Sequence, residues 1–150
     1  MKEAEAIDSK YFKQDYKNPI YIFHGSRVVV PKLEPRQAVC KSGSHTNNQY
    51  AVYGSSSFIG AIPFAFKDIL NHCSIGTGPE DLTMRIYDGV IPEDAFGYIY
   101  VCDARSFENR RDDCQFVSYT DVVPIEVIKV YYRDFKDCFV YEGDSHPRGM

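Results

Sequence analysis

The sequence contains no tryptophan, and its five cysteines follow no pattern that binds a metal ion. No two of them form a Cys-x-x-Cys pair, no histidines stand at a zinc-binding spacing, and an odd number does not suit a disulfide framework. The cysteines are widely separated, at Cys40, Cys73, Cys102, Cys114 and Cys138. We therefore expect no metal site, and reduced thiols as in a cytoplasmic protein.

An excess of positive charge is also lacking, because 17 lysines and arginines stand against 21 aspartates and glutamates, for a formal net charge of -4. The basic residues are scattered rather than gathered into a stripe, which argues against nucleic acid as a partner. No apolar run approaches the length that crosses a membrane, and residues 1–6 are charged rather than leader-like. We expect no membrane partner.

Tyrosine and phenylalanine, by contrast, are abundant, with 12 and 10 copies in a chain whose hydrophobic content is 44%. Aromatic and β-branched residues favour strands, and 150 residues suffice for one domain with a substantial core. We expect an α+β protein in which residues 1–150 form a single domain. The polar ends, 1–18 and 142–150, are expected to be loosely ordered, with a short helix in the first segment packed by its aromatics.

Alternating or continuous apolar runs predict most of the strands. The expected strands are Pro19–Phe23 with a continuation at Arg27–Val30, Tyr50–Tyr53, Met84–Tyr87, Gly97–Cys102, Gln115–Tyr119, Val127–Tyr132 and Phe139–Tyr141. Residues 41–48 and 105–113 are expected to be loops.

A helix is predicted after the second strand, where Phe58, Ile62, Ala65 and Ile69 follow one another at helical spacing behind a serine cap. Pro63 should kink this helix or delay its start. We expect the segment from His72 to Pro79 to close the helix through a turn.

The most informative stretches are Tyr21–Ser26, which contains a His-Gly step, and Tyr50–Ser57, which runs from a strand into three serines. The His24 imidazole could hydrogen-bond a sugar hydroxyl, and Gly25, which has no Cβ, lets a flat ring come close. Tyr53 offers a stacking surface. The plain alternatives are a strand-end histidine, a half-buried strand tyrosine and a simple helix cap.

Together these stretches resemble the NAD-binding signature of the ADP-ribosyltransferase superfamily, in the branch that uses His, Tyr and Glu. The resemblance spans about residues 19–130 and implies two small antiparallel sheets around an NAD cleft with few helices. It implies that His24 binds the adenine-side ribose, Gly25 holds the nicotinamide carboxamide and Ser26 assists at that turn. Tyr53 would then stack on nicotinamide, with Ser55 leaving room for it. NAD is the expected substrate.

The third part of the family signature is a glutamate at the start of a late strand, and this chain has Gln115 there. An amide accepts a hydrogen bond from a ribose hydroxyl but supplies no negative charge to the transition state. Asp113, two positions earlier, is the candidate for orienting an acceptor or replacing the missing carboxylate. Glu126 is a second, less favoured carboxylate. Arg110 and Arg111 either reach a pyrophosphate or belong to a solvated turn.

The resemblance thus implies an NAD-binding protein that transfers ADP-ribose to an unknown macromolecular acceptor. The alternative is a catalytically inactive module that keeps the fold and binds a ligand or a protein. A related RNA 2′-phosphotransferase ranks last, because the basic residues that such a reaction needs around the phosphate are not assembled in this sequence.

Overall fold

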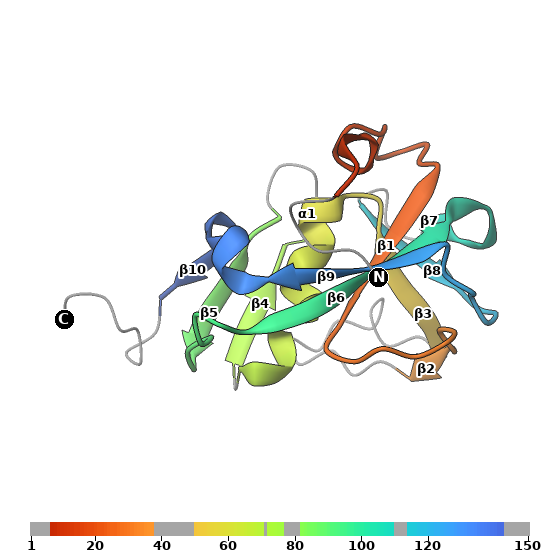
Figure 1. Cartoon of the computed structure of the whole chain (residues 1–150). Helices are drawn as coiled ribbons and strands as arrows, with labels where there is room; N and C mark the ends of the chain where they lie inside the picture. Colours follow the sequence, from red (N-terminus) through yellow and green to blue (C-terminus); the bar gives the residue numbers. More distant parts are fainter. Residues whose placement is uncertain (1–6, 38–49, 71, 77–81, 110–113, 143–150) are drawn as a thin grey trace.

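The computed structural model describes residues 7–37, 50–70, 72–76, 82–109 and 114–142. Within these ranges the chain forms two sheets, one short α-helix and several 3-10 turns (Figure 1). The expected α+β class with two sheets and few helices is confirmed. The strand bounds are β1 Tyr21–Ser26, β2 Arg36–Gln37, β3 Tyr50–Ser55, β4 His72–Ile75, β5 Met84–Asp88, β6 Phe96–Asp103, β7 Glu108–Asn109, β8 Gln115–Ser118, β9 Glu126–Tyr131 and β10 Phe139–Tyr141.

The main sheet has the strand order β7-β8-β3-β1-β6-β9, with β2 added to β3, and every neighbouring pair is antiparallel. The second sheet has the order β10-β5-β4 and is mixed, because β10 lies parallel to β5. The expectation of two small antiparallel sheets is therefore wrong in this detail. One sheet is larger than expected, and the other takes its third strand from a distant part of the chain.

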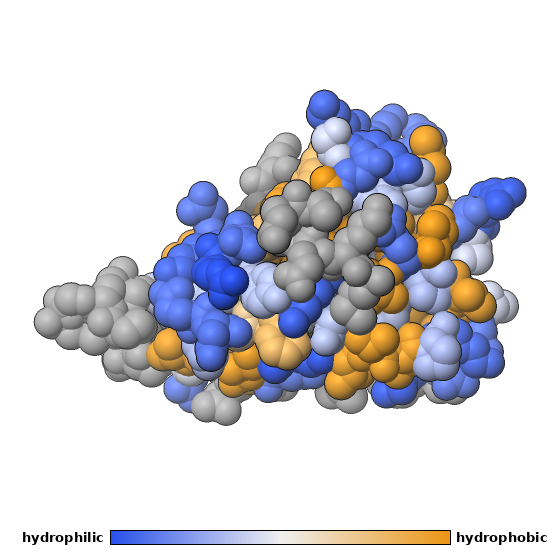
Figure 2. All heavy atoms as spheres, in the orientation of Figure 1, coloured by the Kyte–Doolittle hydropathy of each residue, from blue (hydrophilic) through white to orange (hydrophobic). Residues whose placement is uncertain are grey.

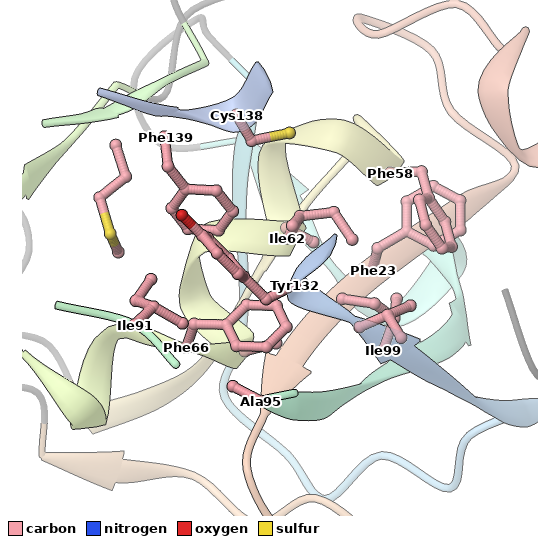
Figure 3. Close-up of a cluster of buried hydrophobic side chains, with 14 of the residues drawn as sticks. Phe23, Phe58, Ile62, Phe66, Ile91, Ala95, Ile99, Tyr132, Cys138 and Phe139 are labelled. Carbon is pink, nitrogen blue, oxygen red and sulfur yellow. The ribbon is translucent and has the colours of Figure 1, made fainter. Parts of the chain in front are cut away.

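The main sheet has two buried faces. The inner face carries Phe23, Ile99 and Val101 and packs against the helical segment after β3 (Figure 3). The outer face carries Ile22, Tyr100 and other members of a smaller cluster, which Leu33 and Val122 cover. Because successive residues of a strand point to opposite faces, neighbours in the chain belong to different clusters.

The predicted helix over residues 58–69 is shorter than expected. Helix α1 covers only Phe58–Ala61, and the 3-10 turns η4, Ile62–Ala65, and η5, Lys67–Ile69, follow it. Pro63 explains the change, since a proline lacks the N–H that would continue the α-helical ladder. The Ser57 side chain caps α1 by accepting a hydrogen bond from the Gly60 N–H at 3.1 Å, as the sequence predicts.

Other expectations also require correction. The segment Arg27–Val30 does not continue β1, which ends at Ser26. The segment from His72 contains β4, with alternating exposure, instead of a turn. Strand β7 lies within the expected loop 105–113. In the lead-in, Tyr11 is buried within the short 3-10 turn η2, Ser9–Phe12, whereas residues 1–6, the loop at 41–48 and the tail at 143–150 lie outside the described residues.

Two glycines let the helical segment sit directly on the sheet. A Cβ on Gly25 would lie 2.5 Å from the carbonyl oxygen of Ala61, and one on Gly97 would lie 2.6 Å from that of Ala65. Both contacts involve backbone atoms, which cannot rotate away. The close approach of η4 to β1 and β6 therefore depends on the absence of side chains at these positions.

Strands β1 and β3 are neighbours for a very short distance. Strand β1 pairs with β6 along all six of its residues, but its register with β3 consists of the pair Phe23 and Ser55. On one side of this pair the Gln14 side chain bridges the strands, with its Nε2 donating to the Tyr21 and Ser56 carbonyl oxygens at 2.7 Å each. On the other side stands the imidazole of His24.

Apolar side chains also remain on the surface. Figure 2 shows apolar groups of this kind among polar and charged ones on the visible face. In the part of the chain that the structure describes, the most exposed large apolar residues are Val123, Ile20, Val28 and Ile125.

Candidate functional site

His24 is held by the strand next to its own. Its Nδ1 lies 2.6 Å from the backbone carbonyl oxygen of Tyr53, and its ring meets the ring of Tyr100 edge-on, with 5.8 Å between centroids. A carbonyl oxygen only accepts hydrogen bonds, so Nδ1 carries the proton and donates. In the neutral ring this tautomer leaves Nε2 as a hydrogen-bond acceptor.

The surroundings of His24 favour this neutral form. Burial is the main cause that lowers the pKa of the imidazole, and the positive charges of Lys67 and Arg36 lower it further, against the raising effect of the bond to Tyr53. The ordinary pKa of histidine is about 6.5, so a lowered value keeps the ring uncharged at pH 7.

Tyr53 lies on the opposite face of the sheet from His24. Phe23 pairs with Ser55, so these two share the inner face, and Tyr53 joins them two residues along β3. His24 follows Phe23 and points to the outer face, beside Tyr100. The structure thus brings the two residues together through the imidazole and a backbone carbonyl, and it does not bring the two rings onto one surface.

Gly25 and Ser26 complete β1. Gly25 is packed against η4, so its lack of a side chain has a structural explanation independent of any ligand. The Ser26 Oγ accepts a hydrogen bond from the Val28 N–H at 3.2 Å, which helps to turn the chain away from the sheet. The hydroxyl hydrogen of Ser26 is still available for donation.

The serines after β3 serve local structure. Ser55 is 8% exposed, and its Oγ accepts from the Ser57 N–H at 3.0 Å. The Ser56 N–H donates to the Cys114 carbonyl oxygen at 2.8 Å, which joins this turn to the chain just before β8. These contacts fix the turn that leads into α1.

Gln115 opens β8 directly opposite Ser55 and is 8% exposed. Gln115, at the position where the resemblance leads us to expect a glutamate, therefore lies on the inner face of the main sheet, with Ser55 and Tyr53. Neither β3 nor β8 contains an aspartate or a glutamate. Asp113, like Arg110 and Arg111, lies outside the described residues.

Glu126 is too distant from Gln115 to act at the same position. It stands in the same cross-strand row as Gln115, but Ser55, Phe23 and Val101 come between them. Four strand spacings of about 4.8 Å separate the two residues by roughly 19 Å. The Glu126 carboxylate instead accepts a short hydrogen bond from the hydroxyl of Tyr11, and burial together with this bond raises the pKa of that phenol.

A surface hollow lies away from these residues. It has a volume of about 640 Å³ and is lined mainly by residues of the 3-10 turns η7, Tyr132–Asp134, and η8, Lys136–Cys138, and by Phe135 between them. None of the predicted site residues lines it. Within the described residues, no group of three His, Cys, Asp or Glu side chains could hold a metal ion. Nor is any helix there long and apolar enough to span a membrane.

Sequence reasoning missed two residues of this region, Gln14 and Tyr100. Gln14 lies in a polar lead-in, and Tyr100 lies in an apolar strand with other tyrosines, so neither carries a local signal. Only the strand order reveals that Gln14 bridges β1 and β3 and that Tyr100 faces His24.

No protein-family model, no curated protein and no solved structure matches this chain.

Proposed function

We propose that this chain binds NAD where β1 and β3 separate, as a domain resembling ADP-ribosyltransferases. The observation that carries the proposal is the hydrogen bond from His24 Nδ1 to the Tyr53 carbonyl oxygen. It fixes the tautomer in which Nε2 accepts, and a ribose hydroxyl is a natural donor to that nitrogen. The lowered pKa of His24 keeps this acceptor available at neutral pH.

Positive charge and an aromatic side chain around His24 support a dinucleotide as the ligand. Lys67 and Arg36 place positive charge near His24, which complements the two negative charges of a pyrophosphate. Tyr53 offers its ring on the inner face for nicotinamide. Because His24 and Tyr53 point to opposite faces, a ligand reaches both only along the line where the two strands diverge, with the adenosine end at His24.

The reaction proposed for this site is slow transfer of ADP-ribose to a macromolecular acceptor. The bond between nicotinamide and ribose breaks dissociatively, and positive charge builds on the ribose ring as nicotinamide leaves with the bonding electrons. Gln115 can accept a hydrogen bond from the ribose hydroxyl but cannot neutralise that charge. Losing one such electrostatic contact lowers a rate by about 10² to 10³.

A second candidate is a binding module that holds NAD or another nucleotide without turnover. The burial of Gln115 opposite Ser55, on two strands without any acidic residue, favours this alternative. A site that binds the ligand but provides no carboxylate at the ribose is suited to recognition.

Calorimetric titration with NAD tests the binding proposal. We expect wild-type binding that weakens at least tenfold in His24→Ala and stays unchanged in the control His72→Ala, which removes a histidine from the second sheet. No binding at millimolar NAD would overturn the proposal, as would equal affinities for wild type and His24→Ala.

Nicotinamide release separates the two candidates. Release by the wild type that disappears in Asp113→Ala supports the transferase. Release that appears only in Gln115→Glu supports the binding module, since that variant restores the charge at the family position.

A further inference from the structure

Tyr100 is a large, fully buried side chain beside His24. It stands at the centre of β6, directly opposite His24 on β1, and is 0% exposed. Its ring meets the imidazole edge-on at 5.8 Å between centroids. The ring therefore limits the directions in which the His24 side chain can turn and favours the one that reaches Tyr53.

The hydroxyl of Tyr100 binds a different part of the chain from the part its ring contacts. It donates to the Val28 carbonyl oxygen at 2.6 Å and accepts from the Val30 N–H at 2.8 Å. Both partners are backbone groups of the segment that follows the His24-Gly25-Ser26 stretch. The hydroxyl thus clamps the chain just beyond the candidate site, on the same face as His24.

The middle of the segment Arg27–Val30 is not fixed by burial of its side chains. Val28 and Val29 are 60% and 48% exposed, and the segment belongs to no strand. A phenylalanine at position 100 would fill the core as well as a tyrosine does, so packing gives no reason for the hydroxyl. Its two hydrogen bonds, together with the bond from the Val28 N–H to Ser26 Oγ, fix the path of the chain from Ser26 to Val30.

We propose that Tyr100 is a positioning residue for the NAD site, acting through His24 and the clamped segment Arg27–Val30 without touching the ligand. This inference rests on the proposed function. The ring holds the imidazole toward Tyr53, and the hydroxyl keeps the end of β1 in place so that Nε2 of His24 and the Ser26 hydroxyl stay oriented together. Loss of the hydroxyl frees the segment while leaving the core filled.

The test compares Tyr100→Phe with the control Tyr98→Phe, which removes a hydroxyl from the same strand and face. We expect Tyr100→Phe to weaken NAD binding about tenfold, the effect of losing two hydrogen bonds at this position. We also expect faster hydrogen exchange at the Val30 amide, and a pKa of His24, followed by NMR, that returns toward its ordinary value. Tyr98→Phe should change none of the three.

The inference would be overturned if Tyr100→Phe speeds hydrogen exchange at the Val30 amide but leaves NAD affinity and the His24 titration unchanged. The clamp would then be a local structural contact. If the wild type itself binds no NAD, the proposed function fails, but the His24 titration still decides whether the Tyr100 hydroxyl, through the clamped segment, keeps the imidazole in place. If Tyr100→Phe does not fold, Val30→Pro removes the donated N–H while Tyr100 stays in the core. That variant should produce the same shift in the His24 titration, and an unshifted titration would also overturn the inference.

Discussion

Replacing Gln14 by alanine should destabilise the protein by about 2 to 4 kcal/mol. The side-chain amide uses all four of its hydrogen-bonding positions: Oε1 accepts from the Ile20 and Tyr21 N–H groups at 3.0 and 2.9 Å, and Nε2 donates to the Tyr21 and Ser56 carbonyl oxygens. Each bond contributes about 0.5 to 1.5 kcal/mol, and water replaces part of the loss because Gln14 is only half-buried. For a chain of this size the loss lowers Tm by about 10 °C.

Gln14→Glu sharpens the test because it keeps the shape and the acceptors but loses both donors. Its ionised carboxylate would face the Tyr21 and Ser56 carbonyl oxygens, so the folded state favours the protonated acid and raises its pKa. The variant should therefore be more stable below the carboxyl pKa of the unfolded chain and lose that stability as pH rises through the folded pKa. Urea denaturation of both variants and of the exposed control Lys13→Ala measures this. Changes below 0.5 kcal/mol in both Gln14 variants would refute the bridging role.

Three further predictions follow from single side chains. Gly25→Ala should cost about 1 to 3 kcal/mol, because its new Cβ meets backbone at 2.5 Å, and a melting curve equal to wild type would contradict this contact. The pKa of His24 is lowered in the folded state, so stability should fall as pH drops below about 6.5, by at most about 1.4 kcal/mol per unit, and flatten below the folded pKa. That slope should vanish in His24→Gln but persist in His72→Gln. Burial raises the pKa of the Cys102 thiol to about 12, so alkylation at pH 8 should label the partly exposed Cys73 before Cys102, and mass spectrometry showing prompt labelling of Cys102 would contradict its burial.

The sequence predicts those parts of the fold that depend on neighbours in the chain. Ser57 caps its helix because the cap and its partner are three residues apart. The strands β5 and β10 match the expected ranges closely, since an apolar run bounded by polar residues is a local pattern. Pro63 marks the end of α1 for an equally local reason.

Features that depend on distant partners escaped prediction. The sequence of β4, His-Cys-Ser-Ile, contains no continuous apolar run, and the strand forms because β5 offers an edge. The parallel pairing of β10 with β5 depends on tertiary packing. In the candidate site, the sequence placed His24 and Tyr53 at the ends of two strands but could not fix their register, and the register decides that they face opposite sides of the sheet.

The parallel pairing of β10 with β5 has a consequence for synthesis of the chain. About fifty residues separate these strands, so at ribosomal speeds of about 5 to 20 residues per second β10 follows β5 by about 3 to 10 s. During that interval β4 can cover one edge of β5, while the other edge, beside the apolar Met84 and Ile86, is open to strands of other nascent chains. We therefore expect pairing of this open edge with neighbouring nascent chains to be favoured where polysomes are crowded.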